Sequence, residues 1–153
     1  MEKKWFVISL MTLVLGATGC RTSRQTEAAA SGKGRTVLLT DTRWKLTGLS
    51  GEPVQMKSAS ALAPYLTFQT VEHSVSGNGG CNLFRGTYEL RPDNGIRFSG
   101  MILTRKMCLD AGDTEDRLMQ AFTETESYAL EGDTLILYGK DAEALARFAA
   151  VSQ

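Results

Sequence analysis

The sequence has few of the residues from which most catalytic and metal sites are built. Its 153 residues include one histidine, three cysteines and three prolines. A site with several histidines is therefore excluded, and a Ser/His/Asp triad would have to use His73. Ser74 and Ser76 lie nearby in the sequence, but they lack the strand-to-helix turn that presents a nucleophilic serine. We interpret His73 as a surface or strand-end histidine and expect that the protein is not an enzyme.

The sequence also lacks a net charge, because 17 basic residues balance 17 acidic ones. This balance disfavours a strongly basic nucleic-acid-binding protein. With 42% hydrophobic and 22% charged residues, the composition is typical of a globular protein. Bulk disorder and a multi-pass membrane protein are excluded, since the only long apolar run lies at the extreme N-terminus.

That apolar run covers residues 5–15 and follows a short basic start, which is typical of a secretory signal peptide. As a helix it would rise only about 16 Å, roughly half of a hydrocarbon core. This length disfavours the alternative, an uncleaved membrane anchor.

Small residues then lead to Cys20, in a pattern that resembles the bacterial lipobox, with Ala17 where the lipobox usually carries leucine. The resemblance predicts that residues 1–19 are a lipoprotein signal peptide and that Cys20 is the lipidation site. Ordinary cleavage that leaves a free thiol is the alternative. Arg21 stands where an aspartate would favour the inner membrane, so we expect the periplasmic face of the outer membrane.

Residues 20–36 are expected to be the lipidated cysteine and a flexible tether. The tether contains no large apolar side chain that would offset the entropy of ordering its backbone. Fifteen residues of this type span about 20 Å on average. Because basic residues outnumber acidic ones here, the tether is either a solvated spacer or a segment that lies on anionic headgroups.

From residue 37 to residue 153, short apolar runs alternate with turn residues, which predicts one compact domain. The fold class is mainly β (α+β), a barrel-like antiparallel sheet with one amphipathic helix. Turn residues at 91–95 and 131–133 predict two hairpins. The predicted strands are residues 43–49, 65–69, 74–77, 84–90, 96–103, 127–130, 134–138 and 145–151.

The helix is predicted from the spacing of Leu118, Met119 and Phe122, over about three turns. Asp113 is placed to cap it, and Asp113, Glu115 and Asp116 oppose the positive end of its dipole. These carboxylates lack the spacing of an EF-hand loop, so capping and solubility explain them better than a calcium site does.

Two cysteines remain when Cys20 carries lipid, and an oxidising envelope favours a disulfide between Cys81 and Cys108. Two buried thiols or a reactive pair are the alternatives. Cys81 follows the glycine-rich residues 77–80, which superficially suggest a phosphate cradle. Cys81 and Asn82 stand where a P-loop needs lysine and serine or threonine, so a tight turn or bulge is the better interpretation.

A set of residues around this turn resembles the two signatures of the META domain, also called the HslJ-like domain. Trp44, Leu46, Gly132, Asp133, Leu135, Leu137 and Phe148 resemble its first and last strands. The resemblance implies a compact, mainly antiparallel β domain with a helix, common in bacterial envelope lipoproteins. Some members are linked to heat shock or antibiotic tolerance, and no reaction is implied. The signature residues are Gly77, Gly80, Cys81, Asn82, Phe84, Gly86, Tyr88, Thr104, Arg105 and Cys108.

These observations predict a lipid-anchored, non-catalytic binding or structural module that holds an envelope protein or polymer, without a cofactor, a metal or a nucleic acid. An inhibitor of a protease or lysozyme that acts in the envelope is the alternative. Arg105 and Lys106 are the candidate binding residues, next to the glycine turn if the disulfide forms. Phe84 and Tyr88 fit either the core or a ligand platform.

Overall fold

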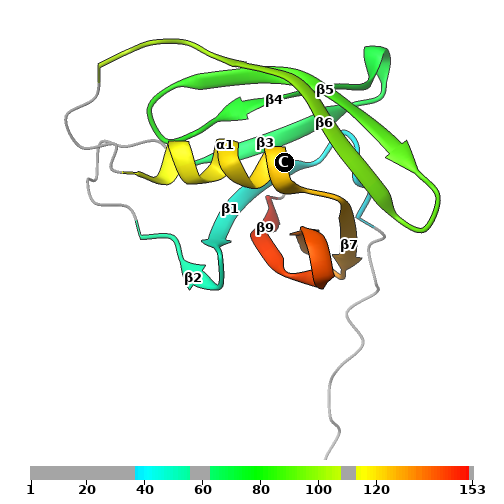
Figure 1. Cartoon of the computed structure of the whole chain (residues 1–153). Helices are drawn as coiled ribbons and strands as arrows, with labels where there is room; N and C mark the ends of the chain where they lie inside the picture. Colours follow the sequence, from blue (N-terminus) through cyan, green and yellow to red (C-terminus); the bar gives the residue numbers. More distant parts are fainter. Residues whose placement is uncertain (1–36, 56–62, 108–112, 152–153) are drawn as a thin grey trace, which may run out of the picture. The chain divides into compact units, whose positions relative to one another are not determined.

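The fold is defined by a computed structural model that describes residues 37–55, 63–107 and 113–151 (Figure 1). The predicted signal peptide and tether, with Cys20, lie outside these described residues, as does Cys108. All described residues belong to one unit by their contacts, Lys33–Gln153.

The sheet is antiparallel throughout, and its strands follow the order β2-β1-β3-β4-β5-β6-β7-β8-β9. A further pairing between β1 and β9 closes it into a ring, as the barrel-like prediction requires. The pairing of β6 with β7 is the shortest in the ring, with Gly95 and Ser127 as its registered pair. The elements are β1 (Arg43–Leu49), β2 (Glu52–Pro53), β3 (Tyr65–Gln69), η1 (Val71–His73), β4 (Ser74–Asn78), β5 (Leu83–Arg91), β6 (Gly95–Leu103), α1 (Thr114–Glu124), β7 (Ser127–Glu131), β8 (Thr134–Tyr138), η2 (Lys140–Ala142) and β9 (Ala144–Val151).

The predicted strands are confirmed, and β1, β3 and β8 have the predicted ends. The two predicted hairpins are confirmed as well. Asp93 and Asn94 adopt φ of 59° and 58° in the turn between β5 and β6, and Gly132 adopts 58° between β7 and β8. The short exposed strand β2 was not predicted, because it forms only where Ser50 and Gly51 reverse the chain at positive φ.

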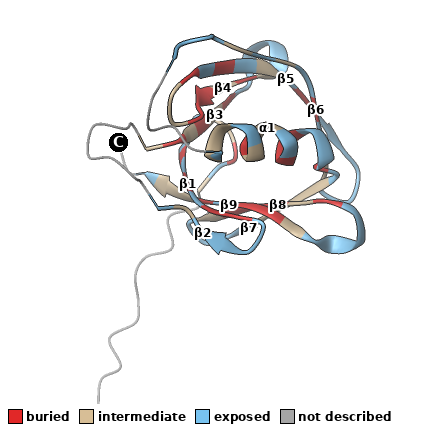
Figure 2. Ribbon diagram, turned by 60° about the vertical axis from the view of Figure 1, so that its left-hand side comes forward, coloured by how far each residue is buried: buried red, intermediate tan, exposed pale blue. Residues whose placement is uncertain are grey.

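Alternation along the strands builds the core on the inner face of the ring. In β1, for example, Trp44 and Leu46 are buried whereas Arg43 and Lys45 are exposed. Figure 2 shows buried residues at intervals along the strands and on the helix α1. The helix lies between β3 to β6 on one side and β7 to β9 on the other.

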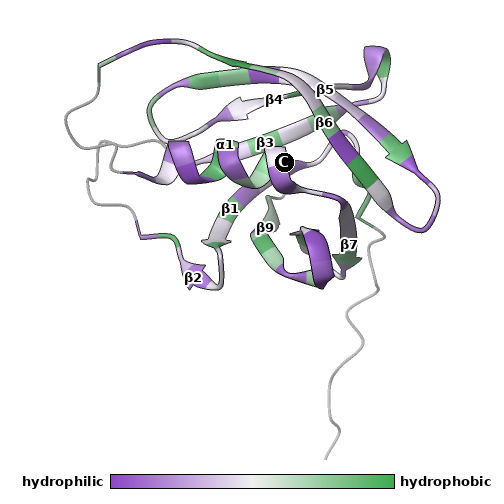
Figure 3. Ribbon diagram, in the orientation of Figure 1, coloured by the Kyte–Doolittle hydropathy of each residue, from purple (hydrophilic) through white to green (hydrophobic). Residues whose placement is uncertain are grey.

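Aromatic rings join α1 to the sheet. Phe122 is buried, and its ring centroid lies 4.8 Å from that of Phe98 and 5.3 Å from that of Phe84. Leu118 is buried one turn earlier, so the helix presents an apolar stripe to the core, seen in Figure 3 as alternation of hydrophobic and hydrophilic residues. The predicted amphipathic helix of three turns is therefore confirmed.

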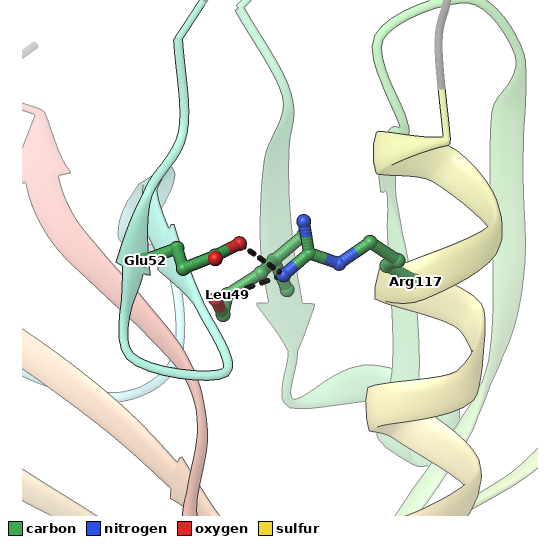
Figure 4. Close-up of polar contacts among 3 residues, drawn as sticks. All are labelled: Leu49, Glu52 and Arg117. Atoms are coloured by element: carbon green, nitrogen blue, oxygen red, sulfur yellow. Dashed lines mark hydrogen bonds and ion pairs between the residues drawn. The ribbon is translucent and has the colours of Figure 1, made fainter.

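A polar contact fixes the other side of the helix. The Arg117 guanidinium donates to the Leu49 carbonyl oxygen at 3.2 Å and pairs with the Glu52 carboxylate at 3.1 Å (Figure 4). Both partners are at the end of β1 or in β2, so Arg117 ties the helix to the opposite side of the ring. Of the helices in the described ranges, none is long and apolar enough to cross a membrane.

The prediction that the Asp113 side chain caps this helix is wrong. Asp113 occupies the N-cap position, but its side chain makes no capping hydrogen bond. A capping residue normally has extended backbone angles, whereas Asp113 has ψ near 0°, which does not direct its carboxylate at the first helical N–H groups. Glu115, also in the first turn, instead bonds to another part of the chain.

Candidate functional site

The glycine-rich connection between β4 and β5 is a tight turn, as the sequence predicts. The side-chain oxygen of Asn78 accepts a hydrogen bond from the Gly80 N–H at 2.7 Å, and the Gly79 N–H donates to the Asn82 carbonyl at 2.8 Å. Gly80 has φ of 117°, a conformation that only glycine adopts readily. Gly77 is required for a different reason: a Cβ there would lie 2.6 Å from a ring carbon of Phe84.

Asn82 is the centre of a polar network at this turn, and it is only 8% exposed. Its side-chain oxygen accepts hydrogen bonds from the Lys106 N–H at 2.7 Å and from the Thr104 hydroxyl at 2.9 Å. Its side-chain amide donates to the Glu115 carboxylate at 2.8 Å, and its backbone N–H donates to the same carboxylate at 2.6 Å. Thr104 in turn accepts from the Leu83 N–H at 3.1 Å. One asparagine thus joins the turn, the segment after β6 and the helix.

This network rules out the phosphate-cradle interpretation of the glycines. An anion at such a loop would need free backbone N–H groups, but the N–H of Asn82 is already bonded to the carboxylate of Glu115. Gly79 packs directly on Glu115, since a Cβ at this glycine would lie 2.7 Å from the glutamate Cγ. The turn therefore presents a fixed negative charge where phosphate would sit.

The remaining signature residues in the described part of the chain also build the fold. Phe84 and Tyr88 are buried, so they belong to the core and not to a ligand platform. The register of the pairing between β5 and β6 shifts at Gly86. A Cβ at Gly86 would lie 2.9 Å from the Ser99 carbonyl oxygen. Of the signature residues placed by the structure, Thr104 and Arg105 are exposed, in the segment after β6.

Cys81 lies beside this same segment. Its sulfur is 3.6 Å from the carbonyl oxygen of Lys106 and accepts a hydrogen bond from the Asn82 amide at 3.5 Å. Cys108 lies outside the described residues, so the disulfide stays a prediction. Arg105 and Lys106 do lie next to the glycine turn, because the backbone of Lys106 is bonded to Asn82.

A groove of about 530 Å³ opens on the outer face of the sheet, over β3 to β6. Its walls combine apolar side chains with hydroxyl groups and one cation. Leu83 and Ile102 in these walls are 47% and 51% exposed, so the groove offers apolar surface to the solvent. The residues that line it include Tyr65, Ser76, Leu83, Arg85, Ile102 and Thr104.

Two arginines lie at the sides of this groove. Arg85 is part of its wall, and the guanidinium of Arg43 lies over the ring of Tyr65, 3.7 Å from its centroid. The ion pairs found among the described residues are Arg91 with Glu89 and Arg117 with Glu52, so neither Arg43 nor Arg85 is neutralised there. None of the described residues that line the groove is acidic.

His73 lies away from the groove and is exposed at the start of β4, as the sequence predicts. Its ring packs edge-on against Tyr88, with centroids 5.7 Å apart. Burial, and to a lesser degree the nearby Asp41 and Tyr128, raise the pKa of the Tyr88 phenol above its usual value. Within the described ranges, no group of three or more histidine, cysteine, aspartate or glutamate residues is placed to hold a metal ion.

Sequence reasoning missed Glu115 as a partner of Asn82, and it missed Tyr65, Arg43 and Arg85 as groove residues. The alternation within β1, β3 and β5 assigns these three to the outer face. Only the pairing of the strands brings them to one place, because β1, β3, β4 and β5 are neighbours in the sheet.

Comparisons with known proteins agree with this architecture. The model of the META domain family matches residues 37–152. A protein from Burkholderia xenovorans solved by NMR is 25% identical, with 75% of this chain and 85% of that one covered and a TM-score of 0.61. A second NMR structure has 21% identity and a TM-score of 0.55, and covers 74% of this chain and 95% of its own.

A crystal structure of a DUF4847 family protein from Bacteroides vulgatus has 13% identity and a TM-score of 0.54. It covers 76% of this chain and 96% of its own length. At this identity the likeness concerns the fold alone. No curated protein matches the chain.

Proposed function

This chain belongs to the META domain family, and we propose that it is a lipid-anchored, non-catalytic binding module of the cell envelope. The observation that supports the proposal is that a fixed framework, the hydrogen-bond network around Asn82, adjoins an open groove. Asn82 and Thr104 hold the segment after β6, and Thr104 also lines the groove. Side chains held in place by such a network bind a partner at a low cost in conformational entropy.

The proposed anchor is Cys20, at the periplasmic face of the outer membrane. Its support is the N-terminal sequence: an apolar run, small residues and then the cysteine. Several acyl chains at about 0.8 kcal/mol per buried methylene make attachment effectively permanent. Intact mass of the detergent-extracted protein tests this. A mass that retains residues 1–19, or that lacks acyl groups on Cys20, contradicts the anchor, and membrane fractionation tests the location.

The proposed disulfide joins Cys81 to Cys108. Its support is the position of the Cys81 sulfur against Lys106, two residues before Cys108 in the sequence. Such a bond would stabilise the domain by about 3.5 kcal/mol in the chain-entropy model. Thiol counting with and without reductant on protein taken from the envelope tests it. Two free thiols without reductant would contradict the bond.

Binding is tested by affinity capture from gently solubilised envelope, with Lys33–Gln153 as bait. The proposal predicts a saturable partner that is lost when the bait carries Asn82→Ala, which opens the framework. Capture of nothing above a denatured bait would contradict a protein partner. A role in envelope stress or antibiotic tolerance is proposed on the family resemblance alone, and growth of a deletion strain under these conditions tests it.

Inhibition of an envelope hydrolase, a protease or a lysozyme, is the second candidate. The turn of the β5–β6 hairpin favours it, because residues 89–94 are all exposed and could enter an enzyme cleft. Assays of captured hydrolases with and without the domain separate the two functions. Inhibition that depends on this turn, and not on the groove, would support the inhibitor.

A further inference from the structure

The outer groove runs across the strands between two rows of side chains, and the inference drawn from it rests on the proposed binding function. Ser76, Arg85 and Ile102 form one wall, because they are opposite one another in β4, β5 and β6. Residues two positions apart on a strand are about 7 Å apart, so the two walls leave room for a single chain. The second wall lies two residues away along the strands and consists of Tyr65, Leu83 and Thr104.

The groove is closed at one end and open at the other. Its lining ends on β3 at Tyr65, whose ring is held by the Arg43 guanidinium, 3.7 Å from the ring centroid. The opposite end of the groove lies at Ile102 on β6. β6 pairs with β7 at Gly95, at the other end of β6, so in the described part of the chain no strand continues the sheet beside Ile102. A chain that enters over β6 therefore meets the ring of Tyr65.

Arg85 is the cation of this groove, and it lies in the wall between Ser76 and Ile102. None of the described lining residues is acidic, and Arg85 forms no ion pair within the ranges that the structure describes. The hydroxyls of Ser76 and Tyr65 make no hydrogen bond within these ranges either. A guanidinium and hydroxyl donors are suitable partners for a carboxylate, which only accepts hydrogen bonds.

The groove becomes apolar at Arg85 and beyond it. Ile102 is opposite Arg85 on β6, and Leu83 is two residues from Arg85 on β5. Both apolar side chains are about half-exposed, and their backbones lie about 5–7 Å from that of the cation. The site therefore suits a ligand whose carboxylate and apolar group are close neighbours.

The last residue of a protein chain carries these two groups side by side. Its carboxylate and its side chain are attached to one Cα atom, and no chain continues beyond it, which suits a groove closed by Tyr65. An internal aspartate or glutamate would need room for the chain that follows. A fatty acid has the same charge, but its acyl chain offers no further group to the hydroxyls of Ser76 and Tyr65, whereas peptide N–H and C=O groups bond to them.

We propose that the outer groove binds the C-terminal end of another protein chain, one whose last two residues are apolar. The terminal carboxylate bonds to the Arg85 guanidinium and to the Ser76 hydroxyl. The apolar side chains leave water and pack on Leu83 and Ile102. Tyr65 stops the chain, so the groove selects a chain end over an internal segment. The positive charge of the lining gives selectivity for the free carboxylate.

The test is fluorescence anisotropy of N-terminally labelled peptides, with the protein extracted from the envelope and placed in phosphatidylcholine nanodiscs. The first peptide ends in two leucines with a free carboxylate. The second is the same peptide with a C-terminal amide, and the third ends in two serines. In the fourth, the two leucines are followed by a glutamate, three threonines and an amide, so that its carboxylate is internal.

We expect saturable binding of the first peptide and binding at least about tenfold weaker for the amide, which lacks the charge that pairs with Arg85. The peptide that ends in serines should bind at least about fivefold more weakly, because it buries no apolar side chain. The peptide with an internal carboxylate should also bind at least about fivefold more weakly, because its chain has to continue past Tyr65.

Matched variants locate the interaction. Arg85→Gln should weaken the first peptide about tenfold and leave the amide unchanged, since the amide has no charge to lose. Ile102→Thr should weaken both by the same factor, because it removes apolar surface and keeps a β-branched residue. Arg97→Gln is the control, because Arg97 is exposed on β6 opposite Glu89 and outside the groove. Unfolding curves of each variant confirm an intact fold.

Equal affinity for the acid and the amide, equal affinity for the terminal and the internal carboxylate, or no binding of any peptide would overturn the inference. So would a loss with Arg97→Gln as large as that with Arg85→Gln. Octanoate that binds more tightly than the first peptide would overturn it as well and identify a site for acyl chains. The proposed function is tested separately: a partner captured equally well by the unchanged and the Arg85→Gln baits leaves the binding module standing and removes this site.

Discussion

The carboxylate of Glu115 accepts hydrogen bonds from both the backbone N–H and the side-chain amide of Asn82, at 2.6 and 2.8 Å. The glutamate is in the first turn of α1, and the asparagine ends the glycine-rich turn before β5. This pair explains why glycine must stand at position 79, where any side chain would meet the glutamate. The signature of the family is here a structural joint between sheet and helix.

The joint should be measurable in stability. Asn82→Ala removes a nearly buried amide together with its side-chain hydrogen bonds to Lys106, Thr104 and Glu115, so we expect a loss of about 2–4 kcal/mol in the free energy of unfolding. Glu115→Ala should cost less, because Glu115 is only half-buried. A double-mutant cycle with Asn82→Ala and Glu115→Ala, measured by urea unfolding, should give a coupling free energy between the two residues above about 1 kcal/mol. Asp116→Ala, which changes an exposed residue in the same turn, is the control. Strictly additive effects of Asn82→Ala and Glu115→Ala on the free energy of unfolding would contradict the joint.

Gly77 should not tolerate even a methyl group. Its added Cβ would lie 2.9 Å from the Leu66 Cα as well as against Phe84, and backbone cannot move aside cheaply. We expect Gly77→Ala to destabilise the domain by about 2–4 kcal/mol, read from urea or thermal unfolding. Gly132→Asn is the matched control: Gly132 has open space around it, and asparagine tolerates its positive φ. Equal losses at the two glycines would contradict this packing.

Phe122 is the main contact of the helix with the aromatic part of the core. Truncation to alanine leaves a cavity beside Phe84 and Phe98, and we expect a loss of about 3–5 kcal/mol. Gln120→Ala on the exposed side of the helix should change the free energy of unfolding by less than about 0.5 kcal/mol. Should both variants unfold at the same urea concentration, α1 would not be packed on the sheet as described.

The strands were predictable because each carries its own signal. Near the ends of β1, β3 and β8, the sequence changes from strand-forming residues to polar or turn residues. The strand bounds predicted from this local pattern therefore agree with the observed bounds. The hairpin turns were predictable for the same reason, since asparagine, aspartate and glycine tolerate positive φ. These features depend on neighbours in the sequence.

The site was not predictable in the same way, because its residues meet only through the closed sheet. Asn82 and Glu115 are 33 positions apart, and Arg43 and Arg85 come from strands separated by two others. An acidic first turn fits a helix dipole equally well, so the sequence assigned Glu115 to the helix end and not to Asn82. The family signature located the turn, but the chemistry of each residue in it required the contacts.

Tyr88 gives a prediction for alkaline pH. Burial first, then Asp41 and Tyr128, raise the pKa of its phenol in the folded state, so folding favours the neutral form. The stabilisation is fully present below the unfolded pKa near 10 and is lost as the pH rises through the folded pKa. An ultraviolet absorbance titration should show one tyrosine that ionises at a higher pH than the others. This ionisation step should be absent in Tyr88→Phe. Stability that rises over this range would have the opposite sign and contradict the assignment.

Whether the outer groove is the working surface is tested most directly by site-specific photo-crosslinking in cells. A photoreactive residue is placed at Ile102 in the groove or at Leu130 on β7, an exposed apolar position outside it. We predict a discrete, saturable crosslink at position 102 that is lost with Arg85→Gln, and none at position 130. Equal labelling at both positions, or a crosslink at position 130 alone, would contradict a binding function for the groove.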